Sequence, residues 1–92
     1  MLTGNHLNEF LGTMFFVYVV IVVKEPVAIA LALLAAILAS KKGMTAHFNP
    51  AVSLGKAMQK GLHNNDLWLL PLSQIAGALA AVELTKLPAL RL

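Results

Sequence analysis

An asparagine-proline pair near the middle of the chain is its clearest sign of a positioned polar group. Asparagine is a favoured N-cap and proline is favoured at the first helical position, so Asn49 and Pro50 predict the start of a helix. Lys56 and Lys60 complement the dipole of this helix, and Gly61 predicts a left-handed C-cap, which limits the helix to about residues 50–60. Such a helix rises only ~15 Å, half the depth of a bilayer. It is therefore either a surface helix with an ordinary cap or a re-entrant half-helix packed in protein or lining a watery cavity.

Polar side chains inside apolar runs form a second group of candidates. Glu9 lies in an apolar run four residues before Thr13, and an ionisable group at membrane depth is a functional hypothesis by default. The alternative is that Glu9 reaches the membrane interface from the start of its span. Gln74 lies in another apolar run, where it is either a buried holding residue or an ordinary polar spot between helices.

The remaining polar residues do not form the patterns of a catalytic or nucleic-acid-binding protein. The three histidines and four acids give no HExxH motif, no nucleophile beside a base and no phosphate loop. Because there is no cysteine, disulfides and zinc-thiolate sites are excluded. The seven basic residues are scattered in ones and twos, which argues against nucleic acid as a partner. We therefore predict no enzyme activity, no cofactor and no metal site.

The composition predicts an all-α membrane protein. The 92 residues are 59% hydrophobic and 12% charged, with a mean hydropathy of +0.78, too apolar for so short a chain to bury in its own core. Apolar runs cover residues 7–23, 26–40 and 67–84, and residues 27–39 contain no polar side chain at all. We predict one module over residues 1–92, with three transmembrane helices, a re-entrant half-helix, and a multi-pass location in a lipid bilayer.

Three motifs, in this order and spacing, resemble the aquaporin and glycerol-facilitator family. They are EFLGT at residues 9–13, HFNPAVSLG at residues 47–55 and QIAGA at residues 74–78. The resemblance covers most of the chain and implies the first half of that family's fold. Channels of this family contain two such halves in inverted orientation, whose half-helices meet head to head at mid-membrane.

The resemblance also implies roles for the residues near the motif. The Asn49 amide would offer N–H donors to the pore, while Pro50 and Ala51 pack the tip of the half-helix. A fixed neutral donor at the positive end of a helix opposes the passage of cations and protons.

Other positions are implied to shape or hold the pore. His47 and Phe48 would line the entrance, although His47 could instead fix the loop through a hydrogen bond. Ile29 falls near a filter position that is usually aromatic, and the holding residues would be Glu9, Thr13 and Gln74.

The basic residues divide almost evenly between the two sides of the predicted spans. On one side lie Lys41, Lys42, Lys56 and Lys60, and on the other lie Lys24, Lys86 and Arg91. Because this balance lets both orientations insert, a single half could pair antiparallel with itself and rebuild a two-fold channel for water or a small neutral solute such as glycerol. The alternatives are a non-conducting module that associates with a full-length channel or another membrane partner, and an inactive truncated product.

Overall fold

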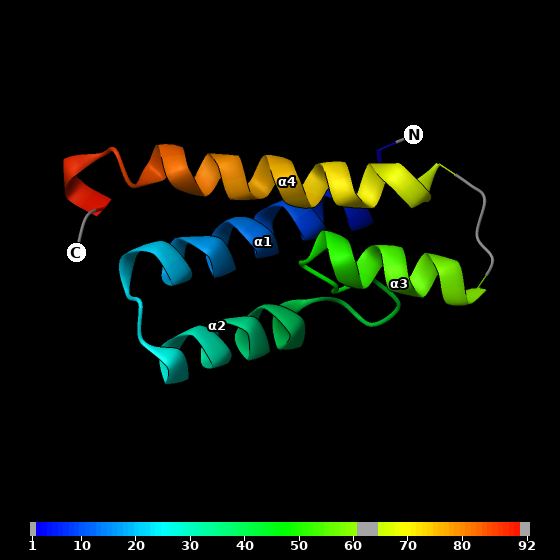
Figure 1. Ribbon diagram of the computed structural model, residues 1–92, viewed down its shortest axis with the longest axis horizontal. Coiled ribbons are helices and arrows are strands. Elements are labelled where there is room, and N and C mark those ends of the chain that lie inside the picture. The colour runs from blue at the N-terminus through cyan, green and yellow to red at the C-terminus, as the bar shows by residue number, and fades with distance from the viewer. Residues whose placement is uncertain (1, 61–64, 91–92) are drawn as a thin grey trace.

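The structure, a computed structural model, describes residues 2–60 and 65–90. The regular secondary structure of these residues is entirely helical (Figure 1). The prediction of an all-α chain is therefore confirmed. Gly61 and Arg91 lie outside the described residues. The α-helices are α1 (Gly4–Val22), α2 (Pro26–Ala39), α3 (Pro50–Lys60) and α4 (Asp66–Leu84), and a 3₁₀ turn follows at Pro88–Leu90.

Local sequence explains where α1 and α2 begin. The Thr3 side chain accepts a hydrogen bond from the backbone N–H of Asn5, and His6 Nδ1 accepts one from the Thr3 N–H, so α1 starts with a capping box. The turn into α2 passes through Lys24, whose φ of 60° is unusual for a residue with a side chain. Glu25 then caps α2, because its carboxylate accepts the N–H groups of the two residues that follow Pro26.

The cap at Glu25 gives a first prediction. We expect Glu25→Ala to lower the free energy of unfolding by about 1 kcal/mol, because two N–H groups of α2 lose their acceptor. Glu25→Asp should retain most of the stability, since aspartate is also a good N-cap. Denaturant titration in detergent, followed by far-UV circular dichroism, measures both variants, and equal losses would contradict the capping role.

The helices are arranged as a bundle in which α1 is the central element (Figure 1). α1 packs along α4 and also on α2, whereas α3 packs on α4. α1 and α4 run in one direction, and α2 and α3 run in the other (Figure 1). α3 begins beside the middle of the long axis, so its N-terminus lies between the two ends of the bundle.

Close packing of α1 on α4 depends on small residues. A Cβ added to Gly77 would overlap the carbonyl oxygen of Phe10 and would lie 3.1 Å from the backbone nitrogen of Met14. Ala81, one turn further along α4, is fully buried. The two helices therefore touch backbone to backbone, as membrane helices with small residues do.

Two helices have the length and composition of membrane spans. α1 and α4 each contain 19 residues, with mean hydropathies of 1.3 and 1.6, and only 17% and 22% of these spans are buried within the chain. A core helix of a soluble protein is mostly buried, so the low burial favours a lipid-facing surface. α2, at 14 residues, is apolar but shorter than a usual span. The bundle is 42 Å long, close to the ~40–45 Å of a bilayer with its headgroups.

Candidate functional site

The loop between α2 and α3 is held by a buried acid on α1. The Glu9 side chain is completely buried, and it accepts hydrogen bonds from the backbone N–H groups of His47 (3.0 Å) and Phe48 (2.8 Å). Hydrogen bonds to a charged acceptor are stronger than neutral ones, so the contacts restrain the main chain of the loop strongly. The structure thus places Glu9 inside the chain and against the loop.

Two asparagines on α1 extend this hold, and the sequence analysis missed them. The Thr45 N–H donates to Asn5 Oδ1 (3.0 Å), and Asn8 Nδ2 donates to the Thr45 carbonyl (2.9 Å) and to Ser40 Oγ (3.0 Å). A usable signal was present, because residues 5, 8 and 9 share one helix face at spacings of three and four. One face of α1 therefore binds the backbone of the loop at Thr45, His47 and Phe48.

Gln74 on α4 joins the loop holder to α3. Its side chain is 1% exposed, and its Nε2 donates to both Glu9 Oε1 (3.1 Å) and Ser53 Oγ (2.7 Å). Ser53, also buried, is a third residue that the sequence analysis missed; it lies between two exposed residues of α3. The three helices α1, α3 and α4 thus share one buried hydrogen-bond network around Glu9.

The network also reaches the ring of His47, whose Nδ1 lies 2.7 Å from Ser53 Oγ. The Ser53 hydroxyl accepts from Gln74 and keeps one hydrogen and a second lone pair, so it can donate to His47 Nδ1 or accept from it, according to the tautomer of the ring. Burial lowers the pKa of His47 and Glu9 opposes this shift, while the charges of Lys56 and Lys60 lower the pKa further. The neutral ring is therefore the favoured state.

Phe48 adopts a conformation that nothing in the sequence predicts. Its φ is 55°, in the left-handed region that costs a non-glycine residue about 1–2 kcal/mol. The ring is only 2% exposed and lies over Gly12, where an added Cβ would overlap it. The bond to Glu9 and the space above Gly12 offset the strained backbone, so the Phe48 side chain belongs to the interior of this chain.

Asn49 presents its amide outward at the start of α3. Its Oδ1 accepts a hydrogen bond from the Ala51 N–H (2.9 Å), and its Nδ2 has no hydrogen-bond partner among the described residues. Asn49, Pro50 and Ala51 are all exposed. The side-chain amide of Asn49 therefore leaves two N–H donors exposed at the start of α3.

Two predicted site residues do not join this network. Ile29 is half-buried in the first turn of α2, and α2 begins at the end of the bundle where α1 ends (Figure 1). Thr13 is buried on α1, but its hydroxyl has no hydrogen-bond partner among residues 2–60 and 65–90. The structure thus brings together Glu9, Gln74 and the loop, and leaves these two positions apart from them.

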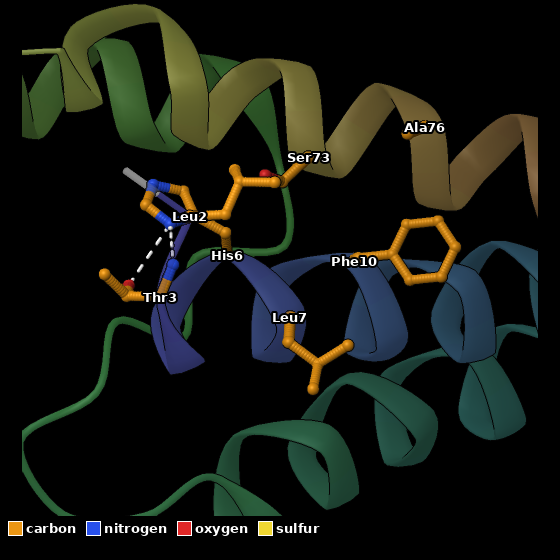
Figure 2. Close-up of a pocket in the computed structure, with 7 residues that line it drawn as sticks. All are labelled: Leu2, Thr3, His6, Leu7, Phe10, Ser73 and Ala76. Atoms are coloured by element: carbon orange, nitrogen blue, oxygen red, sulfur yellow. Dashed lines mark hydrogen bonds between the residues drawn. The ribbon is translucent and has the colours of Figure 1, made fainter.

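An apolar cavity of about 410 Å³ is lined by residues of α1, of the short segment before it and of α4 (Figure 2). Its polar members are already satisfied, because His6 bonds to Thr3 and to Asp66, and Ser73 bonds to the Leu69 carbonyl. The cavity therefore offers a ligand mainly apolar surface.

The chemistry available at the site is that of an exposed neutral donor on a rigid support. Within the described parts of the chain, no group of three or more histidines and acids is placed to hold a metal ion. Comparison with protein-family models, with curated proteins and with solved structures finds no match for this chain.

Proposed function

We propose that the chain is a half-channel of the aquaporin type, which conducts water or a small neutral solute after two copies pair in antiparallel orientation. In this proposal α1, α2 and α4 cross the membrane and α3 is the re-entrant half-helix. The observation that carries the proposal is Asn49, whose Oδ1 is fixed by Ala51 while its two N–H donors are exposed.

The position of Asn49 supports this function. α3 has 11 residues and begins near mid-length of a 42 Å bundle, so its N-terminus would lie near the centre of a bilayer (Figure 1). Irregular backbone at that depth is tolerated only when it is buried in protein or lines a water-filled cavity. An N–H donor there, at the positive end of a helix, binds passing water by its oxygen and repels cations.

The exposure of α3 supports pairing. Val52, Leu54 and Met58 are large apolar side chains on α3 that nothing in the described chain covers, and Met58 is 72% exposed. Around Gly55, an added Cβ would meet no atom within 4 Å. A second copy in inverted orientation would cover this face and bring a second Asn49 to the same depth.

Conduction is tested by osmotic swelling of vesicles of known protein density, with a pH dye trapped inside. Wild type should raise water permeability above that of empty vesicles without a proton leak. Asn49→Asp keeps the cap but replaces the donor by an anion, so a proton or sodium leak should appear. Asn49→Leu removes cap and donors, so flux should fall to the level of empty vesicles.

Asn65→Asp is the matched control for the added charge. Asn65 precedes α4 and makes no capping hydrogen bond through its side chain, so the same substitution there should leave both signals unchanged. No flux in wild type would overturn the pore and leave a non-conducting membrane module. Mapping of a C-terminal tag tests the pairing separately, because a dual-topology dimer requires two populations of equal size.

A further inference from the structure

Two lysines on α3 line a pair of adjoining cavities at the end of the bundle where α4 begins. Lys56 and Lys60 are one turn apart, and both line a cavity of about 430 Å³ and a more enclosed one of about 100 Å³. His47 and Thr45 line both cavities as well. The four residues are called the basic cleft below.

The two lysines of the basic cleft have no direct partner in the described part of the chain. Neither Lys56 nor Lys60 forms an ion pair or hydrogen bond with a residue in 2–60 or 65–90. Asp66 lines the smaller cavity, but its Oδ1 is 2.8 Å from His6 Nε2. Like charges one helical turn apart destabilise a helix slightly, so the pair is unfavourable until an anion joins it.

The third polar group of the basic cleft is the His47 ring, whose Nε2 has no hydrogen-bond partner among the described residues. In the tautomer whose Nδ1 accepts from Ser53, this Nε2 carries a hydrogen and is a third donor. The two ammonium groups can only donate hydrogen bonds. A ligand that fits them must therefore be rich in acceptors.

We propose that the basic cleft binds a phosphate group, either on a lipid headgroup or free in solution. A cavity needs about 10–15 Å³ to hold one water, so a cavity of about 100 Å³ has room for several waters or for one tetrahedral oxyanion. Lys60 is the last residue of α3, and α3 ends beside the starts of α1 and α4 (Figure 1), which is the level of the headgroups if these helices span a bilayer. The site does not depend on conduction.

The test has two arms that use the full chain at physiological salt, where diffuse attraction is screened. In the first arm, inorganic phosphate is titrated into the protein in a neutral detergent. In the second, the protein is placed in nanodiscs of phosphatidylcholine with increasing phosphatidic acid. Backbone amide shifts of Lys56 and Lys60 and the ring nitrogen signals of His47 report occupancy in both arms.

Saturable shifts in the first arm assign a free anion, and saturable shifts only in the second assign a lipid headgroup. Lys56→Gln with Lys60→Gln should weaken binding by about tenfold or more, since both charged hydrogen-bond donors are lost. Lys60→Arg should preserve binding because the charge remains.

The control removes two lysine charges from the loop that precedes α3. Lys41 and Lys42 are exposed in the loop and do not line the basic cleft, so Lys41→Gln with Lys42→Gln should leave the affinity nearly unchanged. Equal weakening by both double variants would overturn the site, because the attraction would then be diffuse. Absence of saturable shifts in both arms would overturn it as well.

Discussion

Replacing Gly77 with alanine is expected to destabilise the chain by about 3 kcal/mol, among the largest effects of any single methyl group in it. The added Cβ would overlap the carbonyl oxygen of Phe10 and crowd the backbone nitrogen of Met14. Neither atom belongs to a side chain that can rotate away, so α1 and α4 must separate. Denaturation by sodium dodecyl sulfate in mixed micelles, followed by the fluorescence of Trp68, measures the loss.

Gly55→Ala is the matched control for this prediction. Gly55 also lies inside a helix, but an added Cβ there meets no atom within 4 Å. Alanine should therefore stabilise α3 by about 0.5–1 kcal/mol through its higher helix propensity. If both variants changed the unfolding free energy in the same direction, close contact between α1 and α4 would not be the cause.

Replacing Glu9 with glutamine is expected to lower the free energy of unfolding by about 3 kcal/mol. The buried carboxylate accepts three hydrogen bonds, and the amide would replace one of its two acceptor oxygens by a donor group. The new NH₂ group must face at least one of the N–H donors from His47, Phe48 or Gln74. Repulsion between donors would release the loop, and Phe48 would lose one of the contacts that hold its strained backbone. The same mixed-micelle denaturation measures the loss.

Glu83→Gln makes the same chemical change at an exposed position. The Glu83 side chain is 70% exposed and pairs with Lys86 three residues later, and such exposed pairs contribute little. This variant should unfold like wild type. Similar losses for Glu9→Gln and Glu83→Gln would show that burial of Glu9 in the hydrogen-bond network does not stabilise the chain.

The sequence indicated the helical class and several of the polar residues that matter, because both follow from pattern. Glu9 and Gln74 stand out as polar groups in apolar runs, and the structure places them in contact. Asn5 and Asn8 were missed because they lie near the end of a span, where polar residues are common. Ser53 was missed because its partners come from α4 and from the loop, and no local pattern reports them.

The geometry of the loop could not be predicted from local preferences. Phe48 has a positive φ, although aromatic residues disfavour it, because Gly12 from another helix leaves space for the ring. Contact between residues so far apart in sequence overrides the local tendency. The sequence does indicate that the second apolar run is short for a membrane span, and α2 ends at Ala39 after 14 residues.

The hydrogen-bond partners of Glu9 all lie downstream of it in the sequence. Its partners His47 and Phe48 are 38 and 39 residues downstream, and Gln74 is 65 residues downstream. In a chain inserted while it is being translated, the first helix carries an acid that has no partner when the helix leaves the ribosome. A carboxyl group without partners in hydrocarbon is costly. The Glu9 carboxyl therefore has to remain protonated, or α1 has to remain beside the insertion machinery, until α4 is made. If α1 spans a bilayer, its stable integration therefore requires synthesis through Gln74, and a ribosome that stalls before residue 74 leaves a helix that the bilayer retains poorly.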